Sequence, residues 1–143
     1  MKRKELIEVA LAAVVAVPTV ILLLASRFAA EGKGLNPGQE LPQAQLMRLD
    51  GQWVNTGSWR GSPTLLVLYR STCRACEREI LGLSSVALSI PRLRIVLLAM
   101  DLAAPRVPTE FPILIDPTDD FLKSVRKTIV PTLYLLDSEG RVR

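Results

Sequence analysis

The sequence predicts an α/β domain in which helices flank a central mixed sheet, preceded by an N-terminal helix that spans a membrane. Three observations lead to this prediction. Two apolar runs without alternation, residues 65–69 and 95–100, have the length of strands that are buried on both faces. The only two cysteines, spaced C-x-x-C, stand between these runs at the start of a helical pattern. A long uncharged segment lies near the N-terminus.

That segment, residues 9–26, approaches the ~20 apolar residues that cross a bilayer as a helix. Basic residues at positions 2–4 precede it, and the positive-inside rule therefore predicts a cytoplasmic N-terminus and an exported remainder. A cleaved signal peptide is the alternative, although its apolar region usually has only ~7–15 residues. We predict an uncleaved anchor over residues 1–28, a linker over 29–38 and the α/β domain over 39–143.

The charge of the chain argues against a nucleic-acid partner. The net charge is +4, and the basic residues at positions 2–4 supply +3 of it, which leaves the remainder close to neutral. Aromatic residues make up 5% of the chain and offer no stacking platform for bases. We therefore predict no nucleic-acid binding.

The first half of the domain contains a hairpin and two strong elements. Residues 45–49 and 52–55 flank an Asp-Gly pair and are typical of a β-hairpin. The run 65–69 follows as a buried strand, and apolar residues near helical spacing over 73–90 predict a helix that ends before Pro91.

The second half continues the alternation of strands and helices. Residues 95–100 predict another buried strand, and the proline-rich stretch 101–112 predicts a loop. The remaining pattern predicts a short strand at 113–115, a short helix at 119–127, a strand at 132–136, a turn at 137–140 and the start of a further strand at 141–143.

Cys73 and Cys76 form the C-R-A-C motif at the start of the predicted long helix. The first thiol of such a motif faces unpaired backbone N–H groups and the positive end of the helix macrodipole, and both favour the thiolate. Arg70, Arg74 and Arg78 add positive charge in the neighbouring sequence. We therefore predict that Cys73 is the nucleophile and that Cys76 resolves the mixed disulfide.

Two other roles are known for closely spaced cysteines. An inert structural disulfide is one alternative, although such a bridge more often joins distant segments. A zinc site needs four ligands, and this chain has no histidine and no third cysteine, so we predict no metal. The position directly after an apolar strand favours the redox role.

A strand that leads into a C-x-x-C helix points to a thioredoxin-like fold. From about Gly38 onward the sequence resembles membrane-anchored thiol–disulfide oxidoreductases of the TlpA/ResA type. The motifs that carry this resemblance are L-D-G at 49–51, G-S-P-T-L-L-V-L-Y at 61–69, S-T-C-R-A-C-E-R-E at 71–79 and I-V-P-T-L-Y-L-L-D-S-E-G at 129–140. The S-T-C also resembles the MauD branch of this group.

The resemblance implies roles for three further residues. Pro131 matches the family's cis-proline beside the disulfide, where the backbone of Val130 would bind a substrate strand. An ordinary proline at the start of a strand is the alternative. Glu79 matches a glutamate that serves proton transfer at the second thiol, and its i, i+3 spacing from Cys76 is compatible with that role. A solvated helix glutamate is the alternative.

The sequence also departs from the family pattern. Thr72 stands where the family usually has tryptophan, and Arg74 and Ala75 are the residues between the cysteines. These three residues are expected to tune the redox potential, and the charge of Arg74 favours the reduced form. The family normally completes another strand and adds a C-terminal helix, so we expect an incomplete C-terminus and an exposed part of the sheet's apolar face.

Together these features predict an extracytoplasmic thiol–disulfide oxidoreductase in the cytoplasmic membrane, with a single span and its domain on the periplasmic or extracellular side. Its partners would be a cysteine-containing client protein and a membrane thiol-redox partner, and no cofactor is expected. A thiol peroxidase is one alternative, but Cys73 lacks the P-x-x-x-T-x-x-C context of such enzymes. A thioredoxin-like binding or chaperone module with a non-catalytic disulfide is the other.

Overall fold

The computed structural model describes residues 34–125 and 129–143. The chain divides into two units, residues 1–33 and residues 34–143, and the described residues all belong to the second. The predicted membrane span and the first half of the predicted linker, residues 29–33, lie outside the described residues. Within 34–125 and 129–143, no helix has the length and apolar character needed to cross a bilayer.

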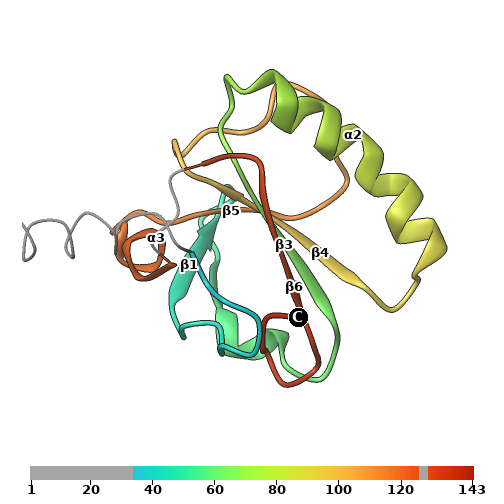
Figure 1. The fold of residues 1–143 in the computed structure, drawn as a ribbon. Helices are drawn as coiled ribbons and strands as arrows, with labels where there is room; N and C mark the ends of the chain where they lie inside the picture. The colour runs from blue at the N-terminus through green and yellow to red at the C-terminus, as the bar shows by residue number, and fades with distance from the viewer. Residues whose placement is uncertain (1–33, 126–128) are drawn as a thin grey trace, which may run out of the picture. The chain divides into compact units, whose positions relative to one another are not determined.

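Residues 34–143 form a six-stranded mixed sheet with helices against it, in the strand order β2-β1-β5-β4-β3-β6 (Figure 1). The strands are β1 (Gln45–Arg48), β2 (Trp53–Asn55), β3 (Thr64–Tyr69), β4 (Arg94–Ala99), β5 (Ile113–Ile115) and β6 (Thr132–Leu136). The helices are the 3-10 turn η1 (Thr56–Trp59), α2 (Arg74–Ser89) and α3 (Asp120–Val125).

β3 is a buried interior strand of the sheet, as its apolar sequence predicted. All six of its residues are buried. It pairs in parallel with β4, from Thr64 opposite Arg94 to Tyr69 opposite Ala99, and antiparallel with β6 on its other side. Because both neighbours are hydrogen-bonded to it and both faces are covered, neither face of β3 needs polar residues.

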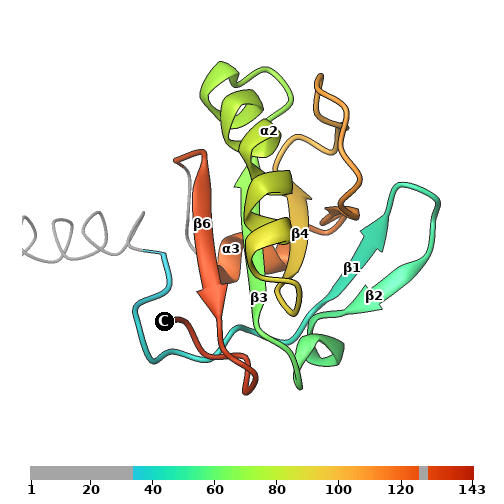
Figure 2. The ribbon, with the colours of Figure 1, turned by 90° about the vertical axis from the view of Figure 1, so that its right-hand side faces the viewer.

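Helices cover both faces of the sheet, as predicted for this fold class. Side chains alternate along β3, so Leu66 and Leu68 join α3 in one core cluster, while Val67 and Tyr69 join α2 in the other. In α2 the buried side chains are those of Cys76, Ile80 and Leu83, which follow one face of the helix. Figure 2 shows α2 in front of the sheet and α3 behind it.

β6 is only partly covered on the α2 face. Leu133 lies opposite Val67 and Leu135 lies opposite Leu65, so both point to that face. Their side chains are 40% and 45% exposed. In Figure 2 α2 lies over β3 and β4, with β6 to one side. This is the exposed apolar sheet surface that the sequence predicted.

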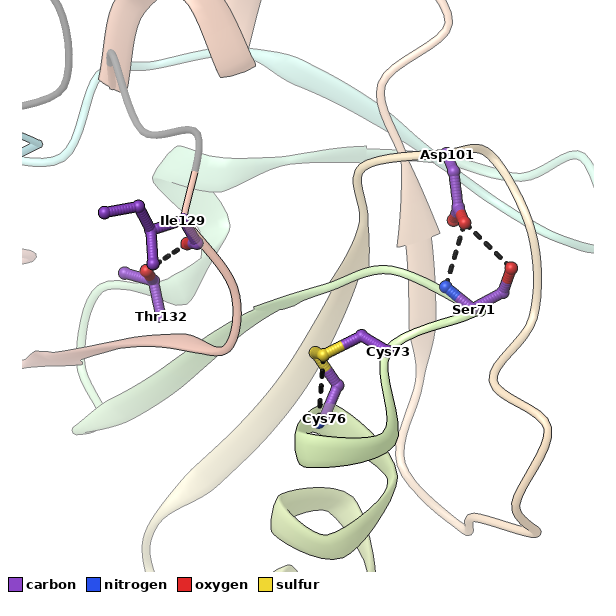
Figure 3. Close-up of a disulfide and its surroundings, with 6 residues drawn as sticks. All are labelled: Ser71, Cys73, Cys76, Asp101, Ile129 and Thr132. Atoms are coloured by element: carbon purple, nitrogen blue, oxygen red, sulfur yellow. Dashed lines mark hydrogen bonds between the residues drawn. A yellow bond between two sulfur atoms is a disulfide. The ribbon is translucent and has the colours of Figure 1, made fainter.

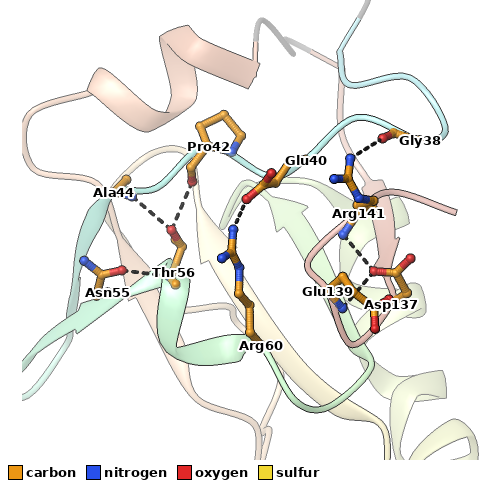
Figure 4. Close-up of polar contacts among 11 residues, drawn as sticks. Gly38, Glu40, Pro42, Ala44, Asn55, Thr56, Arg60, Asp137, Glu139 and Arg141 are labelled. Carbon is orange, nitrogen blue, oxygen red and sulfur yellow. Dashed lines mark hydrogen bonds and ion pairs between the residues drawn. The ribbon is translucent and has the colours of Figure 1, made fainter.

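The two ends of the described domain are tied together. Gly38 N donates to Val142 O at 2.7 Å, and Leu41 N donates to Gly140 O at 2.9 Å. The Arg141 guanidinium donates to Gly38 O at 3.4 Å (Figure 4). The expected strand at 141–143 is limited to isolated bridges, which join Arg141 to Glu40 and Val142 to Leu136.

Two features of the fold were not expected from the sequence. The hairpin joins the main sheet, because β1 pairs antiparallel with β5. The turn η1 directly follows β2, where the Asn55 side chain accepts a hydrogen bond from Gly57 N. Thr56 accepts a hydrogen bond from Ala44 N at 2.9 Å and donates to Pro42 O at 3.0 Å, so it fixes the entry to the hairpin (Figure 4). The predicted extension of α3 to residue 127 lies outside the described residues.

Candidate active site

The cysteine motif lies where β3 passes into α2. Cys73 is the N-cap residue of α2, with an extended backbone at φ −93° and ψ 106°. Its backbone N–H donates to Arg70 O at 3.1 Å and closes the turn 70–73. Its sulfur accepts a hydrogen bond from Cys76 N at 3.1 Å (Figure 3). The Cys73 sulfur therefore takes the place of the side-chain oxygen that usually caps a helix.

Cys73 and Cys76 are joined by a disulfide with a Cα–Cα distance of 5.2 Å. The two sulfurs differ in access, because Cys76 is only 1% exposed whereas Cys73 is half-buried. An incoming thiol or disulfide can therefore reach Cys73 more easily than Cys76. That Cys73 reacts first stays a prediction.

The residues that we expect to tune the redox potential of the cysteine motif are exposed to solvent. Thr72, Arg74 and Ala75 are all exposed. Among the residues that the structure describes, no carboxylate forms an ion pair with Arg74. Its charge is therefore available to the thiol, but water screens it.

The Val130–Pro131 peptide bond is cis, as the V-P-T motif predicted. Leu68 of β3 lies opposite Thr132 of β6, so this bond stands at the end of the sheet where β3 leads to the cysteines. Val130 and Pro131 are both half-buried. Figure 3 shows the adjoining turn, in which the Thr132 hydroxyl donates to Ile129 O at 2.6 Å.

Glu79 lies on α2 three residues after Cys76 and is exposed. Within the described part of the chain it forms no ion pair, with Arg78 or with any other residue. The structure thus leaves its carboxylate open to solvent on the helix that carries the buried thiol. Its role in proton transfer stays a prediction.

Sequence reasoning missed a polar group on the neighbouring strand end. Asp101 follows β4, and its carboxylate accepts hydrogen bonds from Ser71 N at 2.9 Å and from Ser71 Oγ at 2.8 Å (Figure 3). Burial, and secondly the charge of Asp101, raise the pKa of Tyr69 well above its ordinary value. The signal was present in the sequence, because an aspartate directly after a buried parallel strand lies at the edge where such sites form.

Comparisons with known proteins agree with this fold and motif. The AhpC/TSA family profile matches residues 37–143. The chain belongs to the AhpC/TSA family. It is 27% identical to the thiol-disulfide oxidoreductase ResA of Geobacillus thermodenitrificans, an alignment that covers 87% of this chain and 82% of that protein. The predicted resemblance to ResA-type proteins is therefore confirmed.

Solved structures show the same thioredoxin-like fold. The thioredoxin domain of a thiol-disulfide oxidoreductase from Bacteroides vulgatus superposes with a TM-score of 0.65 at 19% identity, over 76% of this chain and 86% of that one. A thiol:disulfide interchange protein from Bacteroides sp. gives a TM-score of 0.64 at 19% identity, over 76% and 79% of the two chains. The thioredoxin-like fold predicted from the strand and C-x-x-C helix is confirmed.

Proposed function

We propose that this protein is an extracytoplasmic thiol–disulfide oxidoreductase that exchanges its Cys73–Cys76 pair with cysteines of a client protein. The observation that carries the proposal is the pairing of a half-buried Cys73 with a buried Cys76 at the N-terminus of α2. The names of the relatives support the same activity. Residues 39–143 would form the catalytic domain, held by the linker 29–38 to a membrane anchor at 1–28.

In the reducing direction the reaction begins with both cysteines as thiols. The Cys73 thiolate attacks a client disulfide, a mixed disulfide forms, and one client thiolate leaves. The Cys76 thiolate then attacks Cys73 Sγ, and the second client thiolate is released. The client gains two electrons and becomes a dithiol, while the enzyme becomes the disulfide seen in the structure. In the oxidising direction the same steps run in reverse.

The surrounding residues suggest how a client is bound and how protons move. The backbone of Val130, ahead of the cis-proline Pro131, would pair with an extended client segment. Glu79 would carry the proton of Cys76 when that buried thiol is activated. Thr72, Arg74 and Ala75 would set the redox potential. Electrons would pass to or from a membrane thiol-redox partner, so no cofactor is required.

The direct test compares two single variants of the full chain. Cys76→Ser leaves the nucleophile without its resolving thiol, so it should accumulate mixed disulfides with clients that reductant releases. Cys73→Ser is the matched control and should trap none. The opposite trapping pattern would reverse the roles of nucleophile and resolving thiol. Trapping by neither variant would refute the proposal of an oxidoreductase.

The same proteins separate the alternative functions. A thiol peroxidase would reduce a hydroperoxide at a rate that depends on Cys73, with formation of the Cys73–Cys76 disulfide and without any disulfide of a client protein. A binding or chaperone module would keep its activity after both cysteines are changed to serine. Loss of client exchange in the double variant, without peroxide consumption by the unaltered chain, supports the oxidoreductase.

The proposed location has its own test. Protease added to intact spheroplasts should remove the domain that carries Cys73, because the N-terminal anchor would leave it outside the cytoplasm. If the domain resists protease until the membrane is lysed, the proposed topology is wrong. The thiol chemistry is tested separately by the trapping variants.

A further inference from the structure

Hydrogen bonds join the ends of β3 and β4 beside the cysteine motif. Met100 N donates to Tyr69 O at 2.9 Å, and Tyr69 Oη donates to Ala103 O at 2.7 Å. Between these contacts, Ser71 donates to the Asp101 carboxylate from both its backbone N–H and its hydroxyl, at 2.9 and 2.8 Å (Figure 3). We call these four hydrogen bonds the strand-end clasp.

The backbone within the clasp adopts a conformation that its sequence disfavours. Leu102 has a φ of +58°, in the left-handed region where the Cβ of an L residue crowds the backbone. Its side chain is 53% exposed, so packing gives little compensation. The hydrogen bonds of Asp101 and Ala103 on either side hold this conformation. Unfavourable backbone conformations of this kind cluster at functional sites.

We propose that Asp101 is a positioning residue for the Cys73–Cys76 pair, an inference that rests on the proposed exchange function. Asp101 holds Ser71, which lies inside the turn 70–73 that Cys73 N closes by donating to Arg70 O. This turn fixes Cys73 at the N-cap of α2, where its sulfur accepts a hydrogen bond from Cys76 N. Asp101 thereby keeps the two sulfurs in the geometry in which the disulfide opens and closes.

The carboxylate acts through its hydrogen bonds more than through its charge. One oxygen, Oδ2, accepts both bonds from Ser71. Asp101 is exposed, so water screens its charge at longer range. An asparagine oxygen can accept the same two bonds without a charge, whereas an alanine can accept neither. Asp101→Asn and Asp101→Ala therefore separate positioning from electrostatics.

The quantity to measure is the effective concentration of the two thiols in the purified full chain, obtained by equilibration with reduced and oxidised glutathione. A well-held pair has a high effective concentration, because the chain has already restricted the motion of both groups. We expect Asp101→Ala to lower it about tenfold, which raises the reduction potential by about 30 mV. Asp101→Asn should stay within about twofold of the unaltered protein, since both hydrogen bonds can form.

Two further variants make the result decisive. Ser71→Ala removes the hydroxyl but keeps the backbone donor, so its effective concentration should lie between those of the two Asp101 variants. If Asp101→Ala does not fold, Ser71→Ala provides the test in its place. Asp50→Ala is the matched control, because Asp50 is also exposed and also accepts a backbone and a side-chain hydrogen bond, at 3.1 Å from Gln52 N and 3.2 Å from Arg48 Nε.

Glutathione equilibration needs no client protein, so this test can succeed or fail independently of client exchange. An unchanged effective concentration in Asp101→Ala would overturn the positioning role. An equal loss in Asp101→Asn would also overturn it and assign the effect to charge. An equal loss of effective concentration in Asp50→Ala would also overturn the positioning role, because the effect would then come from a general loss of stability and not from the strand-end clasp.

Discussion

The stability of the domain should depend on the redox state of its cysteine pair, and the size of the effect follows from the structure. The disulfide joins residues with a sequence separation of 3, so it closes a very short loop. For a loop of about four residues, the chain-entropy relation gives about 1.9 kcal/mol of stabilisation at 25 °C. Loop closure alone therefore makes the oxidised form the more stable one.

Two effects favour the reduced form and oppose loop closure. A Cys73 thiolate at the N-terminus of α2 would gain about 0.3–1 kcal/mol from the helix macrodipole. Arg74 is exposed, so its attraction to the thiolate adds between zero and about 1 kcal/mol. We expect a net preference of about 1 kcal/mol for the oxidised form. This corresponds to a potential about 20 mV below that of the same motif in an unfolded chain.

Urea unfolding of residues 34–143, the compact unit of the structure, measures this difference directly. Trp59 is 6% exposed and reports loss of the core by fluorescence, whereas Trp53 is 58% exposed and changes little. A control with both cysteines changed to serine should unfold identically with and without reductant. If the reduced form proves more stable than the oxidised form, the loop-closure reasoning is refuted and the protein behaves as an oxidant.

Three further predictions concern individual side chains. Glu79→Gln should change the pH profile of exchange while leaving the fold intact, and an unchanged profile would make Glu79 only a surface charge. The raised pKa of Tyr69 means that its contribution to stability is complete below pH ~10 and declines above it, so Tyr69→Phe should reduce the alkaline loss measured by urea unfolding. Changing both Leu133 and Leu135 to threonine should lower binding of a hydrophobic dye to residues 34–143, since both side chains are exposed.

The features predicted correctly from the sequence are those that depend on neighbouring residues. β3 is recognised because residues 65–69 form an unbroken apolar run, and all of them are buried. α2 is recognised because Cys76, Ile80 and Leu83 repeat with the helical period up to Pro91. The cis bond before Pro131 was predicted from the V-P-T motif and the family resemblance.

The features that were missed depend on contacts between distant segments. The pairing of β1 with β5 joins residues more than 60 positions apart, such as Met47 and Ile115. The hydrogen bonds of Ser71 to Asp101 join residues 30 positions apart. The position of Asp101 after a buried strand marks the sheet edge where it lies, but its partner Ser71, like the partner of β1, is defined only once the order of the strands is set. Register and polar pairing at strand ends therefore had to come from the structure.

The position of the active site follows from strand direction. β3 and β4 are parallel, so Tyr69 and Ala99 end at the same edge of the sheet. β6 is antiparallel to β3, so its first residue, Thr132, begins at that edge. The cysteine turn, the Asp101 loop and the cis-proline loop must therefore meet at one place, although they lie far apart in the sequence. A client that docks at Val130, before β6, would meet Cys73 in the turn that follows the neighbouring strand β3. Asp101, which follows β4 on the other side of β3, holds that turn through Ser71.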